Sequence, residues 1–286
     1  VAFGQAGNLC VAIWDGDAVD EICADITALD GFPVIYALAQ VGDLLIVGGS
    51  FDSIAGVPAE NVAVYDLVAE TWSALGDGVD GRVRSLAADG TDVWVGGEFA
   101  NAGGASSPYL ARVAALTGTW TQFTSLDGFA LLGPVYAIGT VGGNIQVAAE
   151  CTFGIGLSAR RVLELAAGSW SAVGGIADGS FDDDVLVISE TLGALSVGGR
   201  FDQVGDQSST VKVPQALAAE FRGGRFVDFQ GGLGAAEDAL VTSPPPVEGA
   251  AVRRLPGESC ERILIAGYPG LNQAAHHPSP LVAIGT

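Results

Sequence analysis

The pentapeptides VGGSF (47–51), VGGEF (95–99) and VGGRF (197–201) decide how this chain is expected to fold. Each places an apolar residue and two glycines shortly before an aromatic ring, and degenerate copies stand at VAAECTF (147–153) and IAGYP (265–269). The leading apolar residues of successive copies are 48, 52, 50 and 68 residues apart. A repeat of about 50 residues is too long for a leucine-rich or ankyrin array and suits a unit of four short strands.

One unit displays four runs of alternating apolar residues bounded by Gly, Asp and Pro, a pattern that indicates β-strands. The runs are VIYALAQ (34–40), DLLIVGGSF (43–51), NVAVYD (61–66) and TWSALG (71–76), with a loop expected at 52–60. Four-stranded units that repeat in this way are typical of propeller blades. The sequence therefore predicts an all-β protein, a β-propeller of four-stranded antiparallel blades.

We expect a single propeller domain over residues 1–286, with either five or six blades. The repeats run roughly over 1–33, 34–82, 83–134, 135–184, 185–238 and 239–286. The repeats at the two ends of the chain each lack some of the four strands of a blade. We therefore expect strands from both termini to combine in one blade and close the ring. The Pro-rich segment 243–261 accounts for the long last spacing and is expected to be a surface loop.

The repeated residues have a packing role in such a blade. Paired glycines remove side chains where strands or blades approach closely, and large rings fill the space between neighbouring sheets. The tryptophans are therefore interpreted as core residues rather than as a platform for sugars. The repeat residues assigned to packing are Gly48, Gly49, Phe51, Trp72, Gly96, Gly97, Phe99, Trp120, Trp170, Gly198, Gly199 and Phe201.

The order of Gly48-Gly49, Tyr65 and Trp72 resembles that of kelch propellers, although Val113 replaces the tyrosine in the next unit. The fuller pattern is similar to the kelch-related repeats of large secreted or cell-surface proteins, including the fungal cortical polarity-marker family. This resemblance implies a propeller. It does not select one activity, because kelch-type propellers include adhesion modules, ubiquitin-ligase adaptors and copper oxidases.

Composition excludes several classes of protein. The 12 basic residues against 33 acidic ones give a formal net charge of −21, and 49% of the 286 residues are hydrophobic. The apolar content argues against disorder, and the lack of clustered bases argues against nucleic-acid binding. The uncharged stretch 128–149 is interrupted by glycines and Pro134, which favours a hairpin over a membrane span.

Two of the four cysteines face each other in a predicted hairpin. A turn at Gly16-Asp17 places Cys10 opposite Cys23, so these residues are either a cross-strand disulfide or two small core residues. A disulfide would favour an extracellular, cell-surface or periplasmic location. The sequence does not indicate a disulfide partner for Cys151 or for Cys260.

The segment 178–184 is a candidate calcium site. Asp178, Asp182, Asp183 and Asp184 form an acidic run in a turn, and hard oxygen ligands of this kind bind calcium. The run lacks an EF-hand pattern, so turn formation or solvation is the alternative interpretation. No other cofactor is expected.

No catalytic motif is present. His276 and His277 are adjacent, face opposite ways in a strand and lack a third ligand. The basic pairs 160–161 and 253–254 are expected to be exposed. No two of the 33 acidic residues can be singled out as the catalytic pair of a glycoside hydrolase.

These observations favour a non-enzymatic extracellular or cell-surface propeller that serves as a structural or protein-interaction module. Its expected partner is a protein or a larger assembly. The alternative is a carbohydrate-binding or carbohydrate-active protein that uses loops over the propeller axis.

Overall fold

The computed structural model describes most of the chain as β-structure in two compact units, Val1–Thr124 and Ser125–Thr286. The described residues contain no helix, which confirms the all-β prediction. They are residues 2–5, 8–14, 19–28, 33–153, 159–174, 180–191, 194–201, 203–204, 211–212, 218–222, 225–228, 247–253, 262–267 and 281–285.

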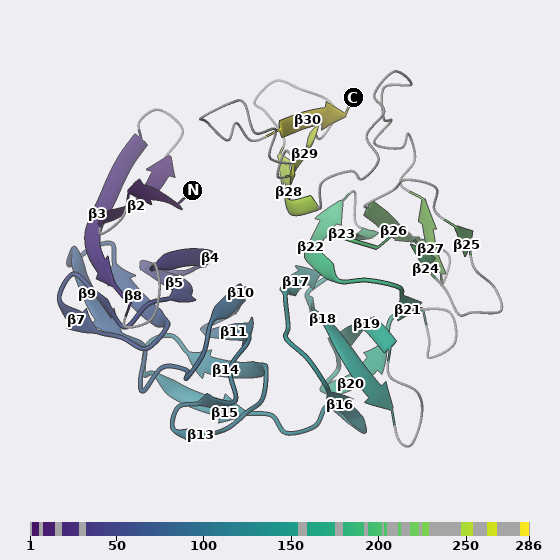
Figure 1. Ribbon diagram of the computed structural model, residues 1–286, viewed down its shortest axis with the longest axis horizontal. Helices are drawn as coiled ribbons and strands as arrows, with labels where there is room; N and C mark the ends of the chain where they lie inside the picture. The colour runs from purple at the N-terminus through teal and green to yellow at the C-terminus, as the bar shows by residue number, and fades with distance from the viewer. Residues whose placement is uncertain are drawn as a thin grey trace. The chain divides into compact units, whose positions relative to one another are not determined.

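The first unit contains two consecutive four-stranded blades. In each, the strands are antiparallel and follow one another across the sheet in chain order (Figure 1). The four strands predicted for residues 34–76 are all present. The strands are β4 (Val34–Val41), β5 (Leu44–Ser50), β8 (Val62–Asp66) and β9 (Thr71–Ala74), then β10 (Val83–Asp89), β11 (Asp92–Gly97), β14 (Leu110–Ala114) and β15 (Thr119–Gln122).

Short hairpins accompany these blades. The segment 52–60, expected as a loop, contains the hairpin β6–β7, and β6 pairs with the end of β3. The next blade has an equivalent hairpin, β12–β13. The remaining strands of the unit are β1 (Ala2–Gln5), β2 (Asn8–Trp14), β3 (Val19–Thr27), β6 (Ser53–Ile54), β7 (Val57–Pro58), β12 (Asn101–Ala102) and β13 (Ala105–Ser106).

The second unit repeats the same order of strands. Its strands are β16 (Phe129–Leu131), β17 (Ala137–Val141), β18 (Asn144–Phe153), β19 (Ala159–Ala166), β20 (Ser169–Ala172), β21 (Ser180–Phe181), β22 (Val185–Thr191), β23 (Ala194–Gly199), β24 (Gln203–Val204), β25 (Val211–Lys212), β26 (Ala218–Arg222) and β27 (Arg225–Asp228). The uncharged stretch 128–149 falls in β16, β17 and β18, as the hairpin interpretation predicted.

The last described strands correct one prediction. Residues 243–261 were expected to be a loop, but β28 (Val247–Arg253) lies within them and pairs with β29 (Arg262–Gly267), which pairs with β30 (Leu281–Gly285). The alternation in VEGAAVR is that of a first strand, which the neighbouring prolines concealed. The number of blades and the closure of the ring stay predictions.

A β-bulge explains the second glycine of each doublet. In β10 the register shifts between Val83 and Ser85, opposite Gly97. A Cβ on Gly97 would collide with the carbonyl oxygen of Arg82, and Gly49 and Gly199 meet backbone carbonyls in the same way. Bulged first strands therefore need a residue without a side chain opposite the bulge.

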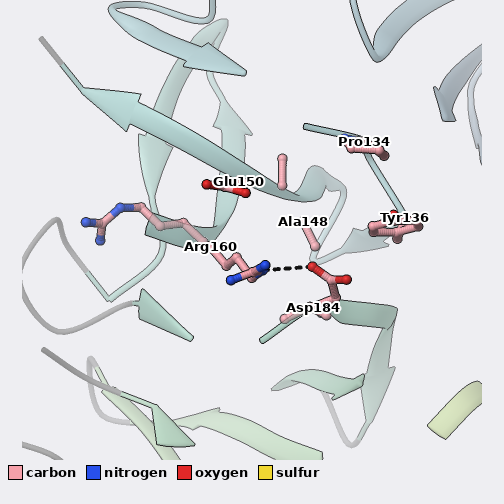
Figure 2. Close-up of a pocket in the computed structure, with 9 residues that line it drawn as sticks. Pro134, Tyr136, Ala148, Glu150, Arg160 and Asp184 are labelled. Carbon is pink, nitrogen blue, oxygen red and sulfur yellow. Dashed lines mark hydrogen bonds and ion pairs between the residues drawn. The ribbon is translucent and has the colours of Figure 1, made fainter. Parts of the chain in front are cut away.

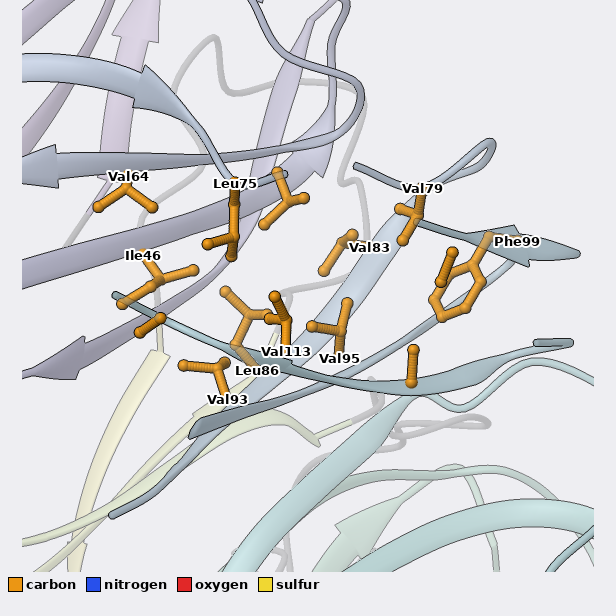
Figure 3. Packing of buried hydrophobic residues seen from close by; sticks show 14 residues of the cluster. Ile46, Val64, Leu75, Val79, Val83, Leu86, Val93, Val95, Phe99 and Val113 are labelled. Carbon is orange, nitrogen blue, oxygen red and sulfur yellow. The ribbon is translucent and has the colours of Figure 1, made fainter. Parts of the chain in front are cut away.

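The first glycine and the aromatic ring contribute to packing between blades. A Cβ on Gly48 would lie 2.5 Å from Cγ1 of Val83 in the next blade. Phe51, Phe99 and Phe201 are 1, 2 and 0% exposed. Figure 3 shows the valine-rich core of the first unit, where Ile46, Val64 and Leu75 of one blade meet Val83, Leu86, Val93, Val95 and Val113 of the next.

The tryptophans also join elements of neighbouring blades. The indole N–H of Trp120 donates to the carbonyl oxygen of Leu75, 3.2 Å away in the preceding blade. A Cβ on Gly103 would lie 2.5 Å from Cγ of Trp120, so this glycine makes room for the ring. Trp170 is buried, and Trp72 packs against the core of the first unit.

Candidate functional site

One pocket in the described residues follows from the degenerate repeat VAAEC. Ala148 and Ala149 occupy the positions of the glycine doublet, and β17 begins only at Ala137, without a bulge. The ladder resumes farther along, where the Leu132 N–H donates to the Glu150 carbonyl and β16 pairs with the end of β18. The methyl group of Ala149 stands where a bulged strand would bring a carbonyl oxygen, so the chain between 133 and 136 leaves the sheet.

The displaced chain leaves a small pocket, here called the Glu150 pocket (Figure 2). About 10 Å³ is open to the centre of a water-sized sphere, the space that one water molecule requires. A small-molecule active site is usually far larger. The pocket is lined by Pro134, Tyr136, Ala148, Ala149, Glu150, Arg160, Arg161, Asp184 and Val185.

One ion pair forms a wall of the pocket. The Arg160 Nε donates to Asp184 Oδ1 at 2.8 Å, and its Nη1 donates to the Asp182 carbonyl at 3.3 Å. The hydrogen bond to Asp184 raises the pKa of Arg160, partly opposed by desolvation. The ion pair therefore links β19 to the residue that precedes β22.

The Glu150 carboxylate, unlike that of Asp184, is not bound by Arg160. It lies directly opposite Arg160 in the β18–β19 ladder, so both side chains share a face of the sheet. The Arg160 guanidinium turns instead to Asp184, as the dashed line in Figure 2 marks. Within the described part of the chain, the Glu150 carboxylate forms no hydrogen bond or close ion pair, but its charge acts on Arg160 and helps to raise the pKa of that guanidinium.

Arg161 lies on the opposite face of β19, because successive residues of a strand alternate. It was expected to be exposed but is only 8% exposed, and its buried Nη1 has no hydrogen-bond partner. The buried free thiol of Cys151 is on the same face. Burial raises the pKa of this thiol to about 11, although the Arg161 charge opposes the shift.

In the first unit, the glutamate at the same repeat position is bound by two arginines. Glu98 is the residue that follows the doublet in VGGEF, as Glu150 follows Ala148-Ala149. Glu98 Oε2 lies 3.2 Å from Arg82 Nη1, and Glu98 Oε1 lies 2.5 Å from Arg84 Nη2. The Arg84 guanidinium also lies 4.3 Å from the ring centroid of Tyr36.

The repeat shows why Glu150 lacks these partners. Leu86 and Ile138 occupy the same repeat position, four residues after Arg82 and Pro134 respectively. Tyr136 correspondingly replaces Arg84. The glutamate is thus retained in the second unit, while both arginines that pair with it in the first unit are replaced.

The calcium candidates among the described residues do not form a recognisable metal site. Asp184 is bound by Arg160, and Asp183 Oδ1 accepts a hydrogen bond from the Asp184 N–H at 2.7 Å. Among the residues described, no group of three or more His, Cys, Asp or Glu could hold a metal. Asp178 and the pair His276-His277 lie outside the described residues, and calcium binding stays a prediction.

The two N-terminal cysteines have the expected register. Cys10 stands directly opposite Cys23 in the β2–β3 ladder. The disulfide itself stays a prediction. Cys260 lies outside the described residues, as does Arg254 of the second basic pair.

Sequence reasoning identified only part of this site. It considered Asp184 as a calcium ligand and Arg160 as an exposed base, and it did not single out Glu150 or Tyr136. The available signal was the repeat itself: superposing VGGEF on VAAEC shows that the glutamate persists without its arginines.

The comparisons with known proteins agree on the architecture. A family model described as the Rax2 C-terminal beta propeller domain matches residues 35–181. Among curated proteins, no relative matches. The similarity of the repeats to kelch-type repeats is not addressed by these matches and stays an expectation.

Three of the solved structures that are similar to this chain show the range of the likeness. The structure of YjhT has a TM-score of 0.51 at 10% identity, covering 94% of this chain and 90% of that one. The computationally designed Ika8 protein has a TM-score of 0.47 at 12% identity, covering 94% and 68%. The designed Ika4 protein has a TM-score of 0.37 at 14% identity, covering 60% and 89%. At such identity, the likeness to YjhT concerns the fold alone.

No helix in the described residues has the length and apolar character needed to cross a membrane.

Proposed function

The chain belongs to the family of Rax2 C-terminal β-propeller domains, and from this premise we propose that it is a non-enzymatic protein-interaction module outside the cell or at its surface. The observation that carries the proposal is the Glu150 pocket, which combines a charged wall with room for about one water molecule. A pocket of this size is too small to enclose a small-molecule substrate, whereas its charged rim can contact the surface of a docked protein.

The use of the repeat residues supports this proposal. The phenylalanines of the doublet motif are buried, and Trp120 holds the preceding blade through its indole N–H. These aromatic rings are therefore occupied within the fold, and function is left to the polar residues between them.

The carbohydrate alternative has less support. Hydrolysis of a glycosidic bond needs two carboxyl groups that flank the sugar and are free to act. Asp184, the second acid of the pocket, is bound to Arg160. The buried Trp94 and Trp170 are also unsuited to stacking on a sugar.

Site-specific photo-crosslinking in the source cells tests the proposal. The variant Tyr136→p-benzoylphenylalanine probes the pocket, and Leu116→p-benzoylphenylalanine in the β14–β15 turn is the control, since Leu116 is 74% exposed. We expect a reproducible protein adduct from position 136 that position 116 does not give. Surface-impermeant biotin should label the same chain on intact cells. Adducts with polysaccharide alone, equal adducts from both positions, or protection from biotin would overturn the proposal.

A further inference from the structure

Two β-bulges of the first unit bring an aromatic ring and an arginine together. The register of β4 shifts at Tyr36 and that of β10 shifts at Arg84, so each is the extra residue of a bulge. The two strands are neighbours (Figure 1), and the Arg84 guanidinium lies 4.3 Å from the centroid of the Tyr36 ring. A bulge re-aims a side chain, and here two successive bulges aim theirs at one place. The ring stays 42% exposed.

Glu98 holds this arginine and a second one beside it. Its Oε1 accepts a hydrogen bond from Arg84 Nε at 2.7 Å, and its Oε2 accepts one from Arg82 Nη1 at 3.2 Å. The backbone N–H of Glu98 also donates to the Arg82 carbonyl oxygen at 2.8 Å. Tyr36, Arg82, Arg84 and Glu98 are here called the Arg82 cluster. Because its members are already held in place, a partner meets a smaller entropy cost on binding.

The Arg82 cluster has one more positive than negative charge. Among the described residues, Glu98 is the only acid that forms an ion pair with either arginine. Asp80 is close in sequence, but its carboxylate accepts from the N–H groups of Ala100 and Asn101 and from the Asn101 side chain. The surplus positive charge is therefore left for an acid from outside the chain.

Arg82 also has the donors that such an acid requires. A guanidinium has five N–H groups, and within the described structure Arg82 donates through Nη1 alone. Its side chain is 54% exposed, so Nε and Nη2 are left for an outside acceptor. Two parallel N–H groups of this kind pair with both oxygens of a carboxylate.

The fold does not require the two arginines. The preceding blade has Val34 and Tyr36 at their repeat positions, and the following blade has Pro134 and Tyr136. Both of these blades still form four strands. The arginine pair therefore belongs to the surface chemistry of one blade rather than to the packing of the repeat.

Resting on the proposed interaction function, we propose that the Arg82 cluster binds one carboxylate side chain of the protein partner. Arg82 donates through Nε and Nη2, Arg84 adds its charge, and Tyr36 contacts the partner beside the carboxylate. Tyrosine and arginine are enriched among the residues that dominate the energetics of protein interfaces. The occupant is a single Asp or Glu, because the formal charge of −21 repels a longer acidic segment.

Titration of the full chain with a probe of known chemistry tests the site. N-acetylaspartate amide is added to isotope-labelled protein, and the Nε–H signals of Arg82 and Arg84 are followed. N-acetylasparagine amide, which has the same shape without the charge, is the matched ligand control. We expect saturable shifts with the aspartate probe and none with the asparagine probe.

Two arginine variants locate the site. Arg82→Gln removes the free donors and should weaken binding by roughly five- to tenfold, because a charge-assisted pair is lost. Arg112→Gln is the matched control, since Arg112 also lies over an aromatic ring, Trp94, but is paired one to one with Asp92. It should leave the affinity unchanged. Signals remote from each substitution report whether the variant is folded.

Photo-crosslinking connects the cluster to the protein partner. The variant Tyr36→p-benzoylphenylalanine places the reactive group inside the cluster. We expect a protein adduct in the source cells whose yield falls when Arg82→Gln is added and stays the same when Arg112→Gln is added. An adduct yield that ignored Arg82→Gln would overturn the carboxylate contact.

The outcomes separate this inference from the proposed function. Equal binding of both amides, unchanged affinity in Arg82→Gln, or saturation by inorganic phosphate at a lower concentration than the aspartate probe would overturn the carboxylate site. A protein adduct from position 136 would in that case still support the proposed function. Aspartate binding without a protein adduct from position 36 or position 136 would contradict both the docked partner and the proposed function.

Discussion

The blade of residues 83–122 and the blade of residues 137–172 have the same strand order but differ at the glycine doublet. In the first, Gly97 faces a bulge in β10, and the arginines at the start of that strand reach Glu98. In the second, Ala149 replaces the glycine, β17 has five residues instead of seven, and Glu150 has no such partners.

The two blades differ at the second glycine of the doublet, which is Ala149 in the second blade, and at the start of the first strand, where Pro134 and Tyr136 stand in place of Arg82 and Arg84. The second glycine permits a bulged first strand, because any side chain there would collide with a backbone carbonyl. Where alanine stands instead, the strand shortens, and a pocket opens beside a glutamate that the repeat has retained. The functional candidate thus lies where the repeat pattern fails.

The largest expected difference concerns the aromatic position of the motif. Phe99 and Cys151 occupy equivalent places, and both are buried. Phe99→Ala should lower the free energy of unfolding by about 3–5 kcal/mol, because it removes a large ring from a packed core. Cys151→Ala should cost only about 1 kcal/mol. Guanidinium denaturation of the two variants measures this, and equal costs would show that the two positions are not equivalent.

The glycine doublet itself gives the next largest effect. Gly97→Ala should destabilise the chain by about 1–3 kcal/mol, because the new Cβ meets the Arg82 carbonyl. The reverse change, Ala149→Gly, should cost at most about 1 kcal/mol, from the added backbone freedom of glycine. Unfolding curves for both variants test the asymmetry; a tolerated Gly97→Ala would remove the explanation for the bulge.

A smaller effect is expected at Asp80, which holds the start of the β12–β13 hairpin in the blade of residues 83–122. Its carboxylate accepts hydrogen bonds from the N–H groups of Ala100 and Asn101 and from the Asn101 side chain. Partial burial raises the pKa of Asp80, but these bonds outweigh it, and the pKa is lowered. A lowered folded-state pKa means that the stabilisation is present above the ordinary aspartate range and is lost as the pH falls through the folded value.

Asp80→Asn should therefore cost about 1 kcal/mol at neutral pH, the scale of one hydrogen bond. Near pH 2 the variant and the parent should have similar stability. Urea denaturation at the two pH values checks this. A cost that did not depend on pH would mean that the Asp80 charge plays no part.

Much of this fold could be predicted from the sequence, because strand alternation and the Gly-Gly-x-Phe motif are local signals. The four strands of residues 34–76 and the opposition of Cys10 and Cys23 followed from them. The strand at 247–253 was missed because prolines nearby suggested a loop. The direction of Arg160 and the burial of Arg161 depend on contacts with distant residues, which no local pattern encodes.

The most direct test of the central claim, that Glu150 is the unoccupied counterpart of Glu98, is a pair of double-mutant cycles. One cycle combines Arg84→Gln with Glu98→Gln, and the other measures the coupling of Tyr136→Arg to Glu150→Gln. Equivalence predicts coupling free energies of similar size in both cycles, about 0.5–1 kcal/mol for partly exposed pairs. Measurable coupling between Arg84 and Glu98, with none between the introduced arginine and Glu150, would contradict the claim.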